Sequence, residues 1–179
     1  MDRFLAVAQI VLGHEGGLVD DPADRGGRTN WGVTQGTLHS ARRTVPGLPE
    51  RVDDLTREQA LEIYRRFYWA FSRCEQMPEP IDFLVFDAAI NCGNGGAGRQ
   101  LQQALNRCGA RLAVDGSIGP KTLGALGAAI NQSLWRVVAA LQTERLAWHA
   151  AIVARDSSQM RFLRGWLNRI LANAREAGV

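Results

Sequence analysis

A glutamate stands at the point where a predicted helix ends. An apolar run over residues 4–12 leads to Glu15, and Gly16 and Gly17 follow it. Glycine lets the backbone turn sharply and lets a substrate come close. The negative end of the helix dipole and partial burial would both raise the pKa of a glutamate here, which suits a general acid working near neutral pH. Glu15 is therefore the candidate catalytic acid. The alternative is an ordinary exposed residue at a helix end.

The Gly-rich polar segment after Glu15 supplies two further candidates, Asp24 and Thr29. A carboxylic acid with a second polar group nearby is the pair that hydrolysis of a glycosidic bond requires. The acid protonates the leaving oxygen, and the second group stabilises the oxocarbenium-like transition state or activates water. Asp20 and Asp21 compete with Asp24 for this role, and each of the three could instead hydrogen-bond the backbone of a turn.

Residues 14–34 resemble the signature of glycoside hydrolase family 108, the lysozyme-like muramidases that include phage endolysins and secretion activators. The spacing of Glu15, Asp24 and Thr29 is also similar to that of the catalytic Glu, Asp and Thr of phage-type lysozymes, with the last gap one residue shorter. The resemblance implies that Asp24 stabilises positive charge or orients water, and that Thr29 positions the nucleophilic water. Because of the shorter gap, Asn30 is the alternative to Thr29.

Aromatic side chains could line a saccharide cleft beside these residues, because aromatic rings stack well on the apolar faces of sugars. Tyr64 and Tyr68 are four residues apart and so share one face of a helix. With Trp31 and Trp69 they form the candidate substrate-binding set. The alternative is that all four belong to a helical core.

Two polar residues interrupt the nearly apolar run over residues 81–91. Asn91 is a further candidate for substrate binding. Asp87 is expected to have a structural hydrogen-bonding role, because burial of a carboxylate without partners is costly. The same structural role is the alternative for Asn91.

The pattern of apolar residues and caps predicts a mainly α fold with a small loop or β lobe near the active site, which is also what the lysozyme-like resemblance implies. Residues 15–33 are rich in turn formers and are expected to form loops or a short hairpin. Thr56 and Gln59 form a capping box. Helices are expected over residues 2–14, 34–43, 56–69, 81–91, 95–107, 133–155 and 159–176.

The second half of the chain carries another resemblance. Residues 101–122, with Asp115-Gly116 as a tight turn and Gly119-Pro120 at a helix start, are similar to the core motif of peptidoglycan-binding modules. Residues 162–169 are similar to the closing helix of family 108. We therefore expect a lysozyme-like catalytic region over residues 1–95 and a helical peptidoglycan-binding-like region over residues 96–179, packed into the same globule.

A glycine pattern over residues 93–98 reads GxGxxG, the fingerprint of a dinucleotide-binding turn, and Asp115 follows about 20 residues later. The fingerprint requires a strand that runs directly into the first glycine, and here residues 87–92 intervene. No second βαβ unit is visible, so we do not expect a nucleotide cofactor.

Composition limits the remaining function classes. The 179 residues are 46% hydrophobic, enough for one domain or one domain with a small module. Three scattered histidines and three cysteines fit no metal site, and the cysteines are expected to be free thiols, although Cys92 and Cys108 could pair. The short apolar N-terminus lacks a cleavage site, and no run is long enough to span a membrane.

The charge of +3 is compatible with a polyanionic partner, either nucleic acid or an anionic cell envelope. In the Arg-rich C-terminal segment, an apolar stripe opposite the arginines favours a solvated helix face over nucleic-acid binding. We expect a monomer that acts on peptidoglycan glycan strands, without stable membrane insertion. It would be made in the bacterial cytoplasm and exported by a holin or a secretion system to the periplasm and cell wall.

These observations predict a cofactor-free N-acetylmuramidase, a glycoside hydrolase that cleaves the β-1,4 bond between N-acetylmuramic acid and N-acetylglucosamine. The alternative is a non-catalytic peptidoglycan-binding protein with a vestigial active site.

Overall fold

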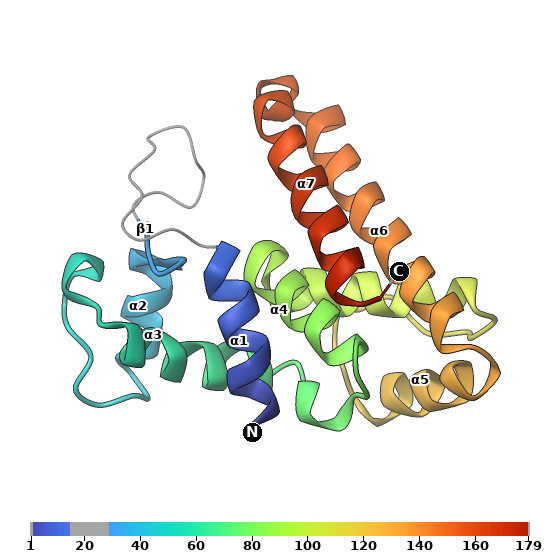
Figure 1. Cartoon of the computed structure of the whole chain (residues 1–179), viewed down its shortest axis with the longest axis horizontal. Helices are drawn as coiled ribbons and strands as arrows, with labels where there is room; N and C mark the ends of the chain where they lie inside the picture. Colours follow the sequence, from blue (N-terminus) through green and yellow to red (C-terminus); the bar gives the residue numbers. More distant parts are fainter. Residues whose placement is uncertain (1, 15–28, 179) are drawn as a thin grey trace. The chain divides into compact units, whose positions relative to one another are not determined.

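The computed structural model describes residues 2–14 and 29–178 (Figure 1). The fold is mainly α with a small two-stranded sheet, as the sequence predicts. The chain divides into two compact units, Met1–Phe71 and Ser72–Val179. The functional division predicted at residue 95 is a different boundary and stays a prediction.

The first unit is built around helix α1. Its buried side chains, Phe4, Val7, Ala8, Val11 and Leu12, recur at the three- and four-residue spacing that places them on one helix face. The ring of Phe4 packs edge-on against that of Trp69, with centroids 5.7 Å apart. The elements of this unit are α1 (Arg3–His14), β1 (Thr29–Asn30), β2 (Val33–Thr34), α2 (Gln35–Ala41), the 3₁₀ turn η1 (Val52–Asp54), α3 (Arg57–Ile63) and η2 (Tyr64–Ala70).

The helix predicted over residues 56–69 begins as expected and then changes its geometry. The side chain of Thr56 accepts from the backbone of Gln59, and the side chain of Gln59 accepts from the backbone of Thr56, which completes the capping box. From Tyr64 onward the helix continues as the π-helix η2. A π-helix widens the turn, so it shifts the direction of the aromatic side chains relative to an α-helix.

The second unit is an arrangement of long helices. In it α4 packs on α6, and α6 and α7 lie side by side as an antiparallel pair (Figure 1). The elements are η3 (Cys74–Gln76), α4 (Ile81–Arg107), α5 (Pro120–Gln132), α6 (Leu134–Arg155), η4 (Ser157–Gln159) and α7 (Met160–Glu176).

Helix α4 joins the two helices that the sequence predicts over residues 81–91 and 95–107. Between them Gly93 has a non-helical backbone, with φ 72° and ψ 159°. This positive φ is a conformation that glycine adopts without strain. The two predicted helices are therefore confirmed, with a kink at Gly93 in place of a loop.

The glycines after this kink allow two backbones to touch. A Cβ built on Gly98 would lie 2.0 Å from the carbonyl oxygen of Gly116, and one on Gly116 would lie 2.7 Å from that of Gly95. The turn at Asp115-Gly116 therefore packs directly on α4. This contact, on a helix without a preceding strand, explains the GxGxxG pattern as a packing motif.

Candidate functional site

Two of the three predicted catalytic residues, Glu15 and Asp24, lie outside the described residues. Asp20 and Asp21, the alternatives to Asp24, lie there too. The third, Thr29, opens strand β1, where its side chain is partly exposed. It pairs across the hairpin with Thr34. The described part of the candidate active site is therefore this hairpin and the elements that hold it.

Asn30, the alternative to Thr29, has a structural position. Its side chain is only 8% exposed, and its amide nitrogen donates to the carbonyl oxygens of Val52, Asp53 and Leu55, at 3.0, 3.3 and 3.3 Å. These bonds tie β1 to η1 and leave the amide nitrogen committed to the backbone. Thr29, the adjacent residue, is thereby held at a fixed place on the strand.

The turn of the hairpin places both central residues, Trp31 and Gly32, at positive φ, 51° and 71°. Such a turn matches the right-handed twist of a two-residue hairpin, but it is uncommon for a tryptophan. The hydroxyl of Tyr64 donates to the carbonyl oxygen of Trp31. The π-helix η2 thus supports the unusual turn, and Trp31 itself remains partly exposed.

The other aromatic candidates differ in exposure. Tyr64 has no exposed surface and Trp69 is 5% exposed, so both serve the core of the first unit in this structure. Tyr68 is partly exposed, and burial raises the pKa of its hydroxyl although the side chain of Thr37 hydrogen-bonds to it. Contact of these rings with saccharide stays a prediction. Of the four, Trp31 and Tyr68 offer surface for it.

Asn91 lies exposed near the end of the first part of α4, where its amide donates to the carbonyl oxygen of Asp87, 2.8 Å away. Its exposure is compatible with the predicted substrate contact, and its bond to the preceding turn is the structural alternative.

Asp87 is fully buried and lies at the centre of an ionic cluster in the second unit. Its carboxylate pairs with Arg145 of α6 and Arg169 of α7, the latter at 2.8 Å, and accepts from the amide of Asn173 at 2.7 Å. Burial raises the pKa of Asp87, but the two guanidinium groups outweigh it and hold the pKa below its usual value. These contacts confirm the structural hydrogen-bonding role expected for Asp87. The sequence did not reveal the partners, because Arg169 and Asn173 follow 82 and 86 residues later.

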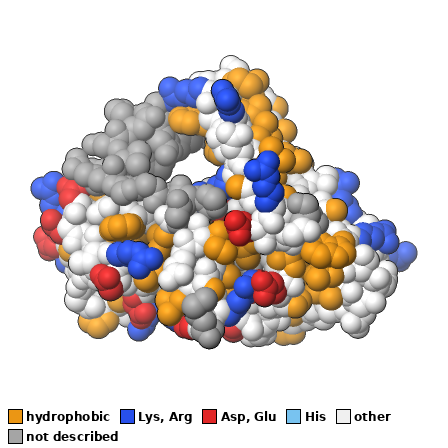
Figure 2. Space-filling model, in the orientation of Figure 1, with side chains coloured by type: hydrophobic (Ala, Val, Ile, Leu, Met, Phe, Trp, Pro, Cys, Tyr) orange, Lys and Arg blue, Asp and Glu red, His pale blue; other side chains and the backbone are white. Residues whose placement is uncertain are grey.

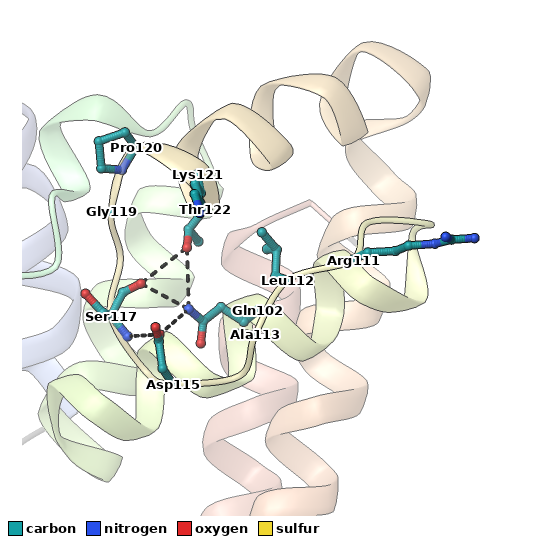
Figure 3. Close-up of a pocket in the computed structure, with 10 residues that line it drawn as sticks. All are labelled: Gln102, Arg111, Leu112, Ala113, Asp115, Ser117, Gly119, Pro120, Lys121 and Thr122. Atoms are coloured by element: carbon teal, nitrogen blue, oxygen red, sulfur yellow. Dashed lines mark hydrogen bonds between the residues drawn. The ribbon is translucent and has the colours of Figure 1, made fainter.

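A pocket of about 520 Å³ opens beside the turn at Asp115 (Figure 3). The side chain of Gln102, 2% exposed, organises it: its amide donates to the Asp115 carboxylate at 2.7 Å and to the Ser117 carbonyl at 3.0 Å, and its oxygen accepts from the Gly116 amide. The Asp115 carboxylate also accepts from the Ser117 amide, and these hydrogen bonds lower its pKa. The residues of the resembled peptidoglycan-binding motif therefore form one hydrogen-bonded structure.

The surface of the second unit carries arginines and apolar side chains on α6 and α7 (Figure 2). On α7 the predicted apolar stripe is only partly covered: Ile170 is buried, whereas Leu171 is 59% exposed.

Cys74, Cys92 and Cys108 are free thiols. Within the described residues no group of three His, Cys, Asp or Glu side chains could hold a metal ion, and no helix is long and apolar enough to cross a membrane.

Comparison with known proteins assigns the two halves of the chain. Residues 8–93 match the family described as glycosyl hydrolase 108, and residues 96–171 match a family described as a predicted peptidoglycan domain. The solved structure of Brucella abortus SagA is 32% identical in sequence and superposes with a TM-score of 0.81 over 97% of this chain and 92% of that one. A search of curated proteins gave no match.

The match to family 108 spans Glu15, Asp24 and Thr29, and the second match spans the Gln102 pocket. Together they identify a glycoside hydrolase that acts on peptidoglycan. The chain belongs to the glycosyl hydrolase 108 family and carries a peptidoglycan-binding region in its C-terminal part.

Proposed function

We propose that this protein is an N-acetylmuramidase, which cleaves the β-1,4 bond between N-acetylmuramic acid and N-acetylglucosamine. Glu15 protonates the leaving oxygen, Asp24 stabilises the positive charge that develops or orients water, and Thr29 positions the attacking water. The observation that carries the proposal is the family match over residues 8–93, which contains all three residues. Their spacing is similar to that of a lysozyme-type site, with the last gap one residue shorter.

The geometry of the hairpin supports Thr29 over Asn30 as the water-positioning residue. The amide nitrogen of Asn30 is occupied by three carbonyl oxygens, while Thr29 lies partly exposed beside it. A hydroxyl can both donate to and accept from a water molecule, which suits this role. In this assignment Asn30 anchors strand β1 through its side-chain amide, and Thr29 on the same strand positions the attacking water.

Residues 96–179 retain the enzyme on its polymeric substrate, while residues 1–95 carry the cleavage. The two family matches support this division of the chain. Because the substrate is peptidoglycan, we place the action of the enzyme at the cell wall. Export by a holin or a secretion system remains part of the proposal, as does action as a monomer.

Analysis of the products tests the proposed bond. Digestion of purified peptidoglycan, reduction of the new ends with borohydride and mass spectrometry of the fragments distinguish the two glycosidic bonds. We expect reduced N-acetylmuramic acid at the ends. Reduced N-acetylglucosamine would show cleavage of the other glycosidic bond, and intact polymer that sediments with the protein would indicate the non-catalytic alternative.

A further inference from the structure

The pocket beside Asp115 has the chemistry of a peptide site more than of a sugar site. Its lining consists of polar and small apolar side chains from residues 102–122, and no aromatic ring is among them. Sugar-binding pockets commonly present aromatic rings, on which the apolar face of the sugar stacks. This pocket offers charged and hydrogen-bonding groups instead, so its ligand should carry complementary charge and amide groups.

One wall of the pocket is a backbone segment with unused hydrogen-bonding groups. Residues 110–114 have no helical or strand structure and run as an unwound path beside the pocket (Figure 3). The side chain of Asn106 binds both the amide and the carbonyl of Leu112, at 2.7 and 3.0 Å. The amide and carbonyl groups of Arg111 and Ala113, on either side, have no partner within the described part of the chain.

This arrangement resembles the edge of a sheet. The Asn106 side chain fixes the segment from one side, as a neighbouring strand would, and leaves the flanking peptide groups for another chain. An extended peptide can bind to such an edge through its own backbone.

The opposite wall contributes a cation. Lys121, the single lysine of the sequence, is exposed at the start of α5 and lines the pocket. Gly119, at the N-cap of that helix, has no side chain to bind the first amides. Arg111 extends outward from the other end of the pocket (Figure 3). Within the described residues neither Lys121 nor Arg111 has an acidic partner, so both can meet carboxylates of a ligand.

We propose that this pocket binds the stem peptide of peptidoglycan, with the peptide backbone along residues 111–113 and a peptide carboxylate at Lys121. The inference rests on the proposed action on peptidoglycan. In that polymer the free carboxylates belong to the peptides, whereas the N-acetylated sugars within the glycan strand are uncharged. The C-terminal region therefore recognises peptides, while the catalytic region acts on the glycan.

The test uses the full-length protein and two soluble probes, N-acetylmuramoyl-L-Ala-D-Glu-diaminopimelate and chitotetraose. We expect the tripeptide probe to shift the backbone amide resonances of Arg111, Ala113 and Lys121 in a titration followed by NMR. Chitotetraose should leave these resonances unchanged. Shifts by chitotetraose alone, or tripeptide shifts confined to other residues, would overturn the proposal.

A charge variant tests the same site independently. Lys121→Gln should weaken binding of the tripeptide probe about tenfold, the effect of one charge-assisted hydrogen bond. Arg164→Gln removes an equal charge from the exposed surface of α7 and should bind as wild type does. Equal affinities of wild type and Lys121→Gln would contradict the carboxylate site.

Cleavage is measured separately, on glycan strands from which an amidase has removed the peptides. Wild type and Lys121→Gln should cleave these strands at the same rate, because the stem peptide is absent. If wild type and Lys121→Gln cleave neither these strands nor intact peptidoglycan, the hydrolase assignment fails. The NMR titration still tests the pocket in that case, because it does not depend on cleavage. If both cleave while the tripeptide does not bind, the peptide site alone is refuted.

Discussion

We expect the stability of the second unit to depend on pH through His149. Its ring is 4% exposed and stacks on the ring of Trp166, with centroids 4.6 Å apart and planes at 20°. Its Nδ1 atom has no hydrogen-bond partner within the described residues. Burial chiefly, and then the positive charge of Arg145, lowers the pKa of His149 to about 4, although Asp87 opposes the shift.

The sign of the effect follows from where the proton binds. In the unfolded chain the imidazole takes up a proton near pH 6.5, but in the folded protein only near pH 4. Between these values the unfolded state binds more protons, so acidification favours unfolding. One proton is worth ~1.4 kcal/mol per pH unit, and over this interval the loss amounts to about 3 kcal/mol.

Urea unfolding at pH 7, 6, 5 and 4.5, followed by tryptophan fluorescence, measures this loss. We expect His149→Phe, which keeps an aromatic ring against Trp166, to remove most of the slope between pH 6.5 and 4.5. His39→Gln, which changes an exposed histidine of α2, should retain the slope of wild type. The reasoning fails if wild type and His149→Phe lose equal stability, or if the imidazole resonance of His149 titrates near pH 6.5 in the folded protein.

Three further substitutions test the packing within each of the two units. Asp87→Asn leaves Arg145 buried without its full counter-charge and should cost about 3–5 kcal/mol in urea unfolding; a cost below about 1 kcal/mol would refute the ionic role. Gly98→Ala places a Cβ against the carbonyl oxygen of Gly116 and should lower the free energy of unfolding by about 3 kcal/mol. Gly127→Ala, on the open surface of α5, should be neutral or slightly stabilising. Similar thermal midpoints for the two variants would refute the close contact between Gly98 and Gly116. Asn30→Ala removes two hydrogen bonds to η1 and one to Leu55, and it should lower the free energy of unfolding by about 1–3 kcal/mol; unaltered urea unfolding would disprove this.

Most helices were predictable because their signals are local. The capping box at Thr56 and Gln59 marks the start of α3, and glycines separate the two parts of α4. The change to a π-helix at Tyr64 had no such signal, because a capping box marks only where a helix begins. Sequence reasoning therefore located the helix and not its final geometry.

The functional and structural residues of the two units were predictable to different degrees. Glu15, Asp24 and Thr29 come from one short motif, whereas the buried partners of Asp87 come from helices far along the chain. The open backbone beside Leu112 could not be foreseen either, because it depends on a side chain six residues away that binds both of its peptide groups. Motifs of adjacent residues reveal chemistry, but long-range pairs and free backbone edges require the structure.

The most direct test of the central claim is the cleavage rate of Glu15→Gln on purified peptidoglycan. Glu58→Gln, which changes an exposed glutamate of α3 in the same unit, is the matched control. We expect Glu15→Gln to lose at least about 10²–10⁴-fold in the release of reducing ends, as for removal of a general acid, with an unchanged circular dichroism spectrum. Glu58→Gln should act as wild type does. A Glu15→Gln variant that cleaves within about twofold of wild type would contradict the assignment of Glu15 as the catalytic acid.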